Sequence, residues 1–217
     1  MAHAAPPMDD VTAYLWATPN SNRVSIMLEE LGLDYAVRGV NIRRREQFDP
    51  VILALNPYGK IPILTWREQG AARSLFESGA ILLHLAERHG RFLPVDEPGR
   101  ADTLAWLMVV LTSLGPYSGQ AHHWTALAAD RPAAAITHHV GLVERVYRVL
   151  DDRLARSAYL AGAYSIADIA AYPWIKRHDW TTLDLGAFPA LMRWYERVSG
   201  REAVRRGMAV PAGAKLE

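Results

Sequence analysis

The chain has 217 residues, half of them hydrophobic, and carries 24 lysines and arginines against 23 aspartates and glutamates. This near balance gives no electrostatic reason to expect a nucleic acid or a membrane surface as partner, and no apolar run is long enough to predict a transmembrane helix. The sequence has no cysteine, which excludes a disulfide, a cysteine nucleophile and a cysteine-ligated metal; any thiol chemistry needs a sulfur carried by a ligand.

The first part of the chain alternates strand and helix patterns. Residues 1–10 are rich in alanine and proline, lack the apolar stretch of a secretory signal, and are predicted to be disordered. Strand patterns follow at 11–17, 35–42, 61–66 and 73–76, and helical patterns at 22–31, 48–55 and 78–89. Because a strand–helix–strand unit makes its two strands parallel and a hairpin adds antiparallel ones, residues 11–90 are predicted to form a thioredoxin-like domain with a mixed four-stranded sheet.

The second part of the chain is almost purely helical in pattern. Residues 91–99 contain two prolines, a glycine and two acids, and are predicted to be a linker. Helical patterns then cover 102–127, 132–156, 166–176, 189–198 and 202–208, with a kink or break expected at Gly115-Pro116. The fold class is therefore α+β, with an all-helical domain over residues 100–217.

Two predicted helices begin with residues that suit a ligand. Glu77-Ser78 precedes the third helix, where Ser78 is a natural N-cap and needs no ligand for that role. The same helix start can also bind a carboxylate, with the Ser78 hydroxyl as a donor, while Glu77 pairs with an ammonium. One α-amino acid ligand satisfies both residues. In the same way, Thr18-Pro19-Asn20-Ser21 is a capped turn that can also stabilise a thiolate.

Pro62 allows two interpretations. It is either an ordinary edge-strand proline or part of a cis Ile61–Pro62 bond, and the first is favoured because only about 5–6% of such bonds are cis. A cis bond would turn the backbone of Ile61 outward, where an extended peptide ligand can pair with it. Elsewhere, Ser165-Ile166-Ala167-Asp168 is read as a structural capping box, and the paired histidines at 122–123 and 138–139 lack the spacing of a metal site.

Taken together, the motifs resemble the soluble glutathione transferase family. They are the Thr-Pro-Asn turn, Asn-Pro-Tyr-Gly-Lys-Ile-Pro at 56–62, Glu-Ser-Gly-Ala-Ile-Leu at 77–82 and Ser-Ile-Ala-Asp at 165–168. The similarity runs from about residue 11 to 207. It looks closest to the bacterial nu class of glutathione-dependent disulfide-bond oxidoreductases, through residues 76–82 and 120–123.

The resemblance implies where glutathione binds. Glu77 and Ser78 would hold the ammonium and carboxylate of the γ-glutamyl group. The backbone of Ile61, before a cis Pro62, would pair with the cysteinyl part. No metal is implied.

The resemblance also implies roles for the residues near the two remaining parts of the ligand. Lys60 and Gln47 would lie near the glycyl end. Thr18 and Asn20 would lie beside the sulfur as the catalytic pair, and are preferred to Tyr14, which lies inside the first strand.

The function expected from these observations is reduction of disulfides by a bound glutathione thiolate. Two alternatives stay open: a detoxifying transferase that adds glutathione to electrophiles, and a glutathione-binding module without turnover. The family implies a homodimer in which a basic residue reaches the partner's ligand, although His138 stands at that position. The absence of cysteine fits a cytoplasmic location.

Overall fold

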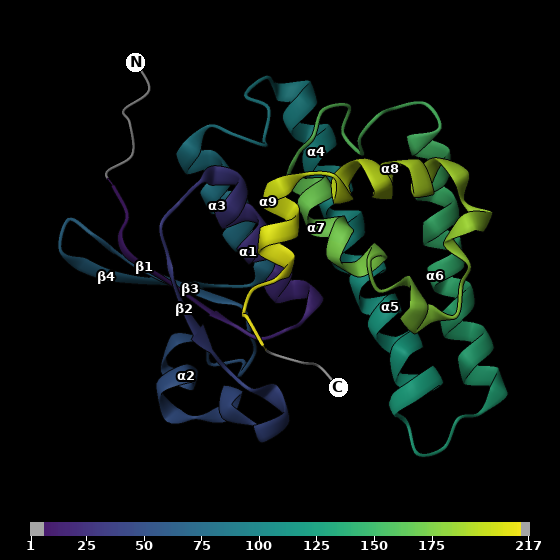
Figure 1. The fold of residues 1–217 in the computed structure, drawn as a ribbon, viewed down its shortest axis with the longest axis horizontal. Coiled ribbons are helices and arrows are strands. Elements are labelled where there is room, and N and C mark those ends of the chain that lie inside the picture. Colours follow the sequence, from purple (N-terminus) through teal and green to yellow (C-terminus); the bar gives the residue numbers. More distant parts are fainter. Residues whose placement is uncertain (1–6, 214–217) are drawn as a thin grey trace. The chain divides into compact units, whose positions relative to one another are not determined.

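The computed structural model describes residues 7–213 and divides into two compact units (Figure 1). Of the described residues, the first unit contains 7–91 and 202–213. The second is Phe92–Arg201. Of the segment predicted to be disordered, residues 1–6 lie outside the described residues. Asp9 and Asp10 already belong to the first strand.

The first unit is built on a mixed sheet of four strands in the order β2-β1-β3-β4. The strands are β1 (Asp9–Leu15), β2 (Ala36–Gly39), β3 (Ile63–Glu68) and β4 (Ala71–Phe76). β1 runs parallel to β2 and antiparallel to β3, and β3 and β4 form a hairpin. Side chains alternate along β1, so that Val11, Ala13 and Leu15 are buried while Thr12 and Tyr14 face the other side.

Helices cover both faces of this sheet (Figure 1). They are α1 (Pro19–Leu31), α2 (Pro50–Leu55) and α3 (Ser78–His89). α1 and α3 lie on one face and the short α2 on the other. This arrangement confirms the predicted thioredoxin-like domain.

The second unit is helical. Its helices are α4 (Glu97–Val109), α5 (Gly115–His122), α6 (Ala133–Leu154), α7 (Ile166–Ile175) and α8 (Pro189–Ser199). α4 begins inside the predicted linker 91–99, because Asp96 caps it by accepting a hydrogen bond from the Gly99 N–H at 2.8 Å. The helical half of the predicted fold class is confirmed.

Of the kink or break expected at Gly115-Pro116, the break does not occur. A π-helical turn at Val110–Leu114 joins α4 to α5, and a second at His123–Leu127 extends α5. The wider turn directly before Pro116 leaves room for a ring that would clash with the backbone of a regular helix. The capping box is confirmed: the Ser165 hydroxyl accepts from the Ala167 N–H, and the Asp168 carboxylate accepts from the Ser165 N–H.

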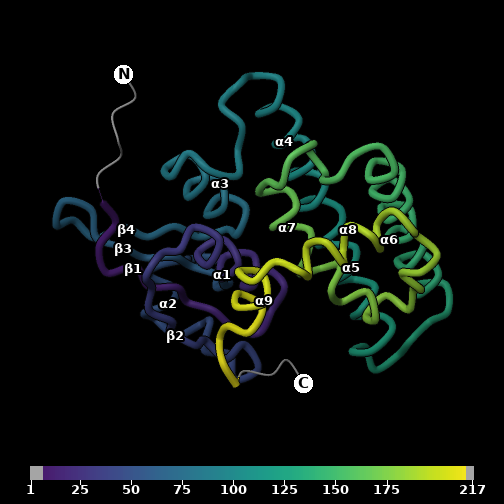
Figure 2. The backbone as a smooth tube through the Cα atoms, turned by 45° about the horizontal axis from the view of Figure 1, so that its top comes forward, coloured from purple at the N-terminus to yellow at the C-terminus, as the bar shows by residue number. Residues whose placement is uncertain are grey.

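The last helix, α9 (Glu202–Met208), differs from the predicted assignment of residues 100–217 to one helical domain. It belongs to the first unit, where it lies beside α1 (Figure 2). The carbonyl of Gly207 accepts hydrogen bonds from Ser25 Oγ at 2.6 Å and Asn22 Nδ2 at 3.4 Å. These long-range contacts, rather than any local pattern, place α9 on the sheet-containing unit.

Replacing Gly207 by alanine is expected to destabilise the protein by about 2 kcal/mol. A Cβ atom there would lie 2.5 Å from Ile26 Cα and 2.6 Å from its backbone N, so α9 must move away from α1. Chemical denaturation checks the prediction. The control is Gly141→Ala in α6, where a Cβ meets nothing within 4 Å and helix propensity predicts stabilisation by up to about 1 kcal/mol. Equal stability of the two variants would contradict the close contact.

Candidate active site

A small polar cavity of about 100 Å³ lies in the first unit. Six of the eight predicted site residues line it, together with Asn56: Asn20, Lys60, Ile61, Pro62, Glu77 and Ser78. They come from the start of α1, the segment before β3 and the start of α3. The cavity therefore brings together three segments that are far apart in the sequence and whose backbone groups are not all used in regular structure.

The segment before β3 contains a cis Ile61–Pro62 bond, which is the alternative that the sequence favoured less. Ile61 precedes β3 and lies outside its ladder. The buried Asn56 shapes the segment: its Nδ2 donates to the Lys60 carbonyl at 2.7 Å and its Oδ1 accepts from the Tyr58 N–H at 3.0 Å. Asn56 was not identified from the sequence, where it reads as an ordinary turn residue.

The start of α3 is arranged differently from the N-cap that the sequence suggested. The N-cap is Glu77, and Ser78 is the first residue of the helix, so the interpretation of Ser78 as the cap is wrong. Glu77 has φ of 70°, a conformation that costs a residue other than glycine about 1–3 kcal/mol and often marks a functional site. Its side chain makes no capping bond, and it lines the cavity beside the free N–H groups of the helix.

Behind Ser78 lies a buried cation that the sequence analysis missed. Arg23, on α1, is 3% exposed, and its Nη1 donates to Ser78 Oγ at 3.1 Å. Burial lowers the pKa of Arg23 to about 9, and the nearby Glu77 carboxylate partly opposes this shift. The guanidinium is therefore charged at neutral pH. In the sequence of α1, Arg23 looks like an ordinary polar residue on the exposed face of an amphipathic helix. The local sequence therefore does not indicate that its side chain is buried next to Ser78.

The turn into α1 holds the predicted catalytic pair. Thr18 is the N-cap of α1, which begins at Pro19 and not at the predicted residue 22: its hydroxyl accepts from the Ser21 N–H at 3.2 Å and donates to Ser21 Oγ at 3.0 Å. Ser21 Oγ also accepts from the Trp16 N–H at 3.2 Å, which ties the turn to the end of β1. Asn20 lines the cavity, whereas Thr18, two residues earlier in the sequence, is not among the lining residues.

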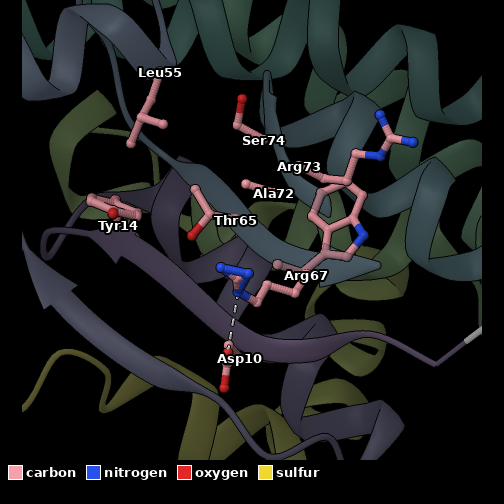
Figure 3. Close-up of a pocket in the computed structure, with 9 residues that line it drawn as sticks. Asp10, Tyr14, Leu55, Thr65, Arg67, Ala72, Arg73 and Ser74 are labelled. Atoms are coloured by element: carbon pink, nitrogen blue, oxygen red, sulfur yellow. Dashed lines mark ion pairs between the residues drawn. The ribbon is translucent and has the colours of Figure 1, made fainter. Parts of the chain in front are cut away.

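Two further residues lie away from the cavity. Gln47 is in a short 3₁₀ helix, Glu46–Phe48, and its buried Oε1 has no hydrogen-bond partner among the described residues. Tyr14 lines a separate hollow of about 340 Å³ on the α2 face of the sheet, with Leu55, Thr65 and Ser74 (Figure 3). Because side chains alternate along β1, Tyr14 points to this face.

No group of three or more histidines, aspartates or glutamates within residues 7–213 has the arrangement of a metal site. No helix in the same range has the length and apolarity needed to span a bilayer.

Comparison with known proteins identifies related sequences and structures. Residues 15–98 match the family model of the glutathione S-transferase N-terminal domain, and residues 96–202 that of the C-terminal domain. The disulfide-bond oxidoreductase YfcG of Escherichia coli is 39% identical over 202 residues, which cover 91% of this chain and 94% of that protein.

Two solved structures are similar over nearly the whole chain. A glutathione transferase from Pseudomonas putida, with one glutathione disulfide bound per subunit, has 34% identity and a TM-score of 0.89, covering 94% of this chain and 92% of its own. A glutathione transferase from Burkholderia graminis, with two glutathione molecules bound per subunit, has 32% identity and a TM-score of 0.88, covering 95% and 90%.

Proposed function

The chain belongs to the glutathione S-transferase family, and from this premise we propose that it is a glutathione-dependent disulfide-bond reductase. The observation that carries the proposal is that one polar cavity joins the starts of α1 and α3 to the segment that contains Ile61 and Pro62. A γ-glutamyl tripeptide has an ammonium and a carboxylate at one end and a thiol in its middle. The residues that line the cavity include groups that suit the ammonium and the carboxylate, and the start of α1 offers groups that suit a thiolate.

The γ-glutamyl group would bind at the start of α3. Its carboxylate receives hydrogen bonds from Ser78 and from the first free N–H groups of the helix, and its ammonium pairs with Glu77. The cysteinyl backbone pairs with the outward groups of Ile61. Lys60 and Gln47 are assigned to the glycyl carboxylate, with Lys60 at the cavity and Gln47 outside its lining.

The thiol would reach the start of α1, where Asn20 and the Thr18 hydroxyl stabilise its thiolate. The thiolate attacks one sulfur of a substrate disulfide, so that a mixed disulfide forms and the other half leaves as a thiolate that takes up a proton. A second glutathione thiolate then attacks the mixed disulfide, which releases the reduced substrate and glutathione disulfide. With no cysteine in the chain, the protein supplies position and charge stabilisation and no nucleophile of its own.

Similar proteins support the proposal. The relative from E. coli is named a disulfide-bond oxidoreductase, and the structure from P. putida contains glutathione disulfide. A homodimer in the cytoplasm is part of the proposal, with the exposed His138 on α6 in the position from which a basic residue would reach the partner's ligand.

The experiment that tests the proposal compares two reactions of the purified protein with glutathione. One is reduction of a small model disulfide and the other is conjugation to an aryl halide. We expect the initial rate of disulfide reduction to exceed that of conjugation. A faster conjugation would favour the transferase alternative, and calorimetric binding of glutathione without turnover in either reaction would favour the binding module.

A further inference from the structure

Arg23 stands directly behind the cavity and does not line it. Its guanidinium is buried between α1 and α3, and its Nη1 lies 3.1 Å from Ser78 Oγ. Ser78 is itself 5% exposed and is one of the lining residues. A ligand in the cavity therefore meets Ser78, and Arg23 acts on it through that hydroxyl.

The hydrogen bond fixes the polarity of the Ser78 hydroxyl. A guanidinium can only donate, so Ser78 Oγ is the acceptor in this pair. The hydroxyl hydrogen is then left to donate to another group, and the cavity is on its other side. A carboxylate accepts at both oxygens and fits this donor, whereas an ammonium can only donate and does not.

The charges around Ser78 favour the same kind of ligand. A buried cation is poorly screened by water and salt, so Arg23 acts strongly on a charge placed next to Ser78. The start of α3 adds the positive end of the helix dipole. Glu77 is the one acid among the lining residues, and it offers a partner for an ammonium.

We propose that Arg23 is a positioning residue that makes the Ser78 end of the cavity selective for the α-carboxylate of the γ-glutamyl group. This inference rests on the proposed function and deepens it. Arg23 does not touch the ligand. It would nevertheless determine the preference of the cavity for a ligand that carries the α-carboxylate over a ligand of similar shape that lacks it. The alternative is that Arg23 only joins α1 to α3 as a structural contact.

Calorimetry with two ligands distinguishes these alternatives. The ligands are glutathione and γ-aminobutyryl-cysteinylglycine, which keeps the amine and thiol but lacks the α-carboxylate. In Arg23→Met we expect the Kd for glutathione to rise about tenfold or more, since a charge-assisted interaction is lost. The Kd for the second ligand is expected to stay within about twofold, because it never carried the group that Arg23 favours. Arg23→Lys keeps a buried cation and donor, and is expected to restore the preference for glutathione.

Equal weakening of both ligands in Arg23→Met would overturn the inference, because a structural role weakens binding without regard to the carboxylate. An unchanged Kd for glutathione, or an Arg23→Lys variant without the preference, would overturn it as well. Arg148→Met on α6, which removes an exposed arginine paired with Glu144, is the control and leaves both constants unchanged. Failure of the proposed function has different signatures: without a glutathione site the wild-type protein would bind neither ligand, and without reductase activity it would bind glutathione but not reduce the model disulfide.

Discussion

Replacing Asn20 by alanine is expected to lower kcat/KM for disulfide reduction at neutral pH by about 100-fold, the cost of removing one donor from a preorganised anion site. Asn20 lines the cavity at the start of α1. In the proposed complex its amide and the N–H groups of the first helical turn would face the thiolate. A cysteine thiol has an ordinary pKa of about 8.5. Without Asn20 the thiolate is less stabilised, so the rise of rate with pH is expected at higher pH in the variant.

Thr18 is expected to contribute through its hydroxyl hydrogen. This hydrogen now bonds Ser21 Oγ, and it can turn to a thiolate while the oxygen keeps accepting from the Ser21 N–H. Thr18→Ala therefore lowers the rate, and Thr18→Ser retains it. Thr112→Ala, which removes an exposed hydroxyl bonded only to the Met108 carbonyl in its own helical run, serves as the control. Wild-type rates in both Asn20→Ala and Thr18→Ala would exclude this pair as the catalytic residues.

Asp168→Asn is expected to destabilise the protein by about 3–4 kcal/mol, in the range found when a buried charged group loses its partners. The carboxylate is fully buried, and burial raises its pKa to about 6, so it is ionised at pH 7.5. Its Oδ1 accepts from the Leu160 N–H and Trp194 Nε1, and its Oδ2 from the Ser165 N–H and Oγ. Whichever way an asparagine turns, its NH₂ group faces at least one N–H donor: those of Leu160 and Trp194 at one position, and that of Ser165 at the other.

The measurement is the thermal midpoint at pH 7.5, expected to fall by about 10 °C for a chain of this size. Asp184→Asn is the matched control. Asp184 is exposed and accepts from the Gly186 N–H at 2.8 Å, and an asparagine oxygen can keep that bond. Its effect is expected to stay within about 0.5 kcal/mol. Similar losses in both variants would show that the buried network around Asp168 is not a main source of stability.

The sequence was most informative where local rules decide the outcome. The strands, the helices and the Ser165–Asp168 capping box follow from period, turn residues and caps, and the motif resemblance correctly identified the family. Pro116 shows the limit of such rules, because a π-helical turn accommodates a proline that a regular helix rejects. α9 shows another limit, since its position depends on how closely Gly207 approaches α1.

The site was predictable to the extent that its residues carry local motifs. The Glu77-Ser78 pair, the Thr-Pro-Asn turn and Pro62 were visible as helix starts and a strand start, and six of the eight predicted residues meet at one cavity. Arg23 could not be found in this way, because its partner Ser78 is 55 residues away in the sequence. The N-cap of α3 could not be predicted from local sequence either. Helix-capping propensity assigns that role to Ser78, but in the structure the cap is Glu77 and Ser78 Oγ accepts a hydrogen bond from Arg23.

A crystal structure of the protein with glutathione bound tests the central claim most directly. We expect the γ-glutamyl group at Glu77 and Ser78, the cysteinyl backbone paired with Ile61, and the sulfur closest to Asn20 or Thr18. Glutathione bound with its sulfur next to Tyr14 on the α2 face, or an empty cavity at saturating glutathione, would contradict the account.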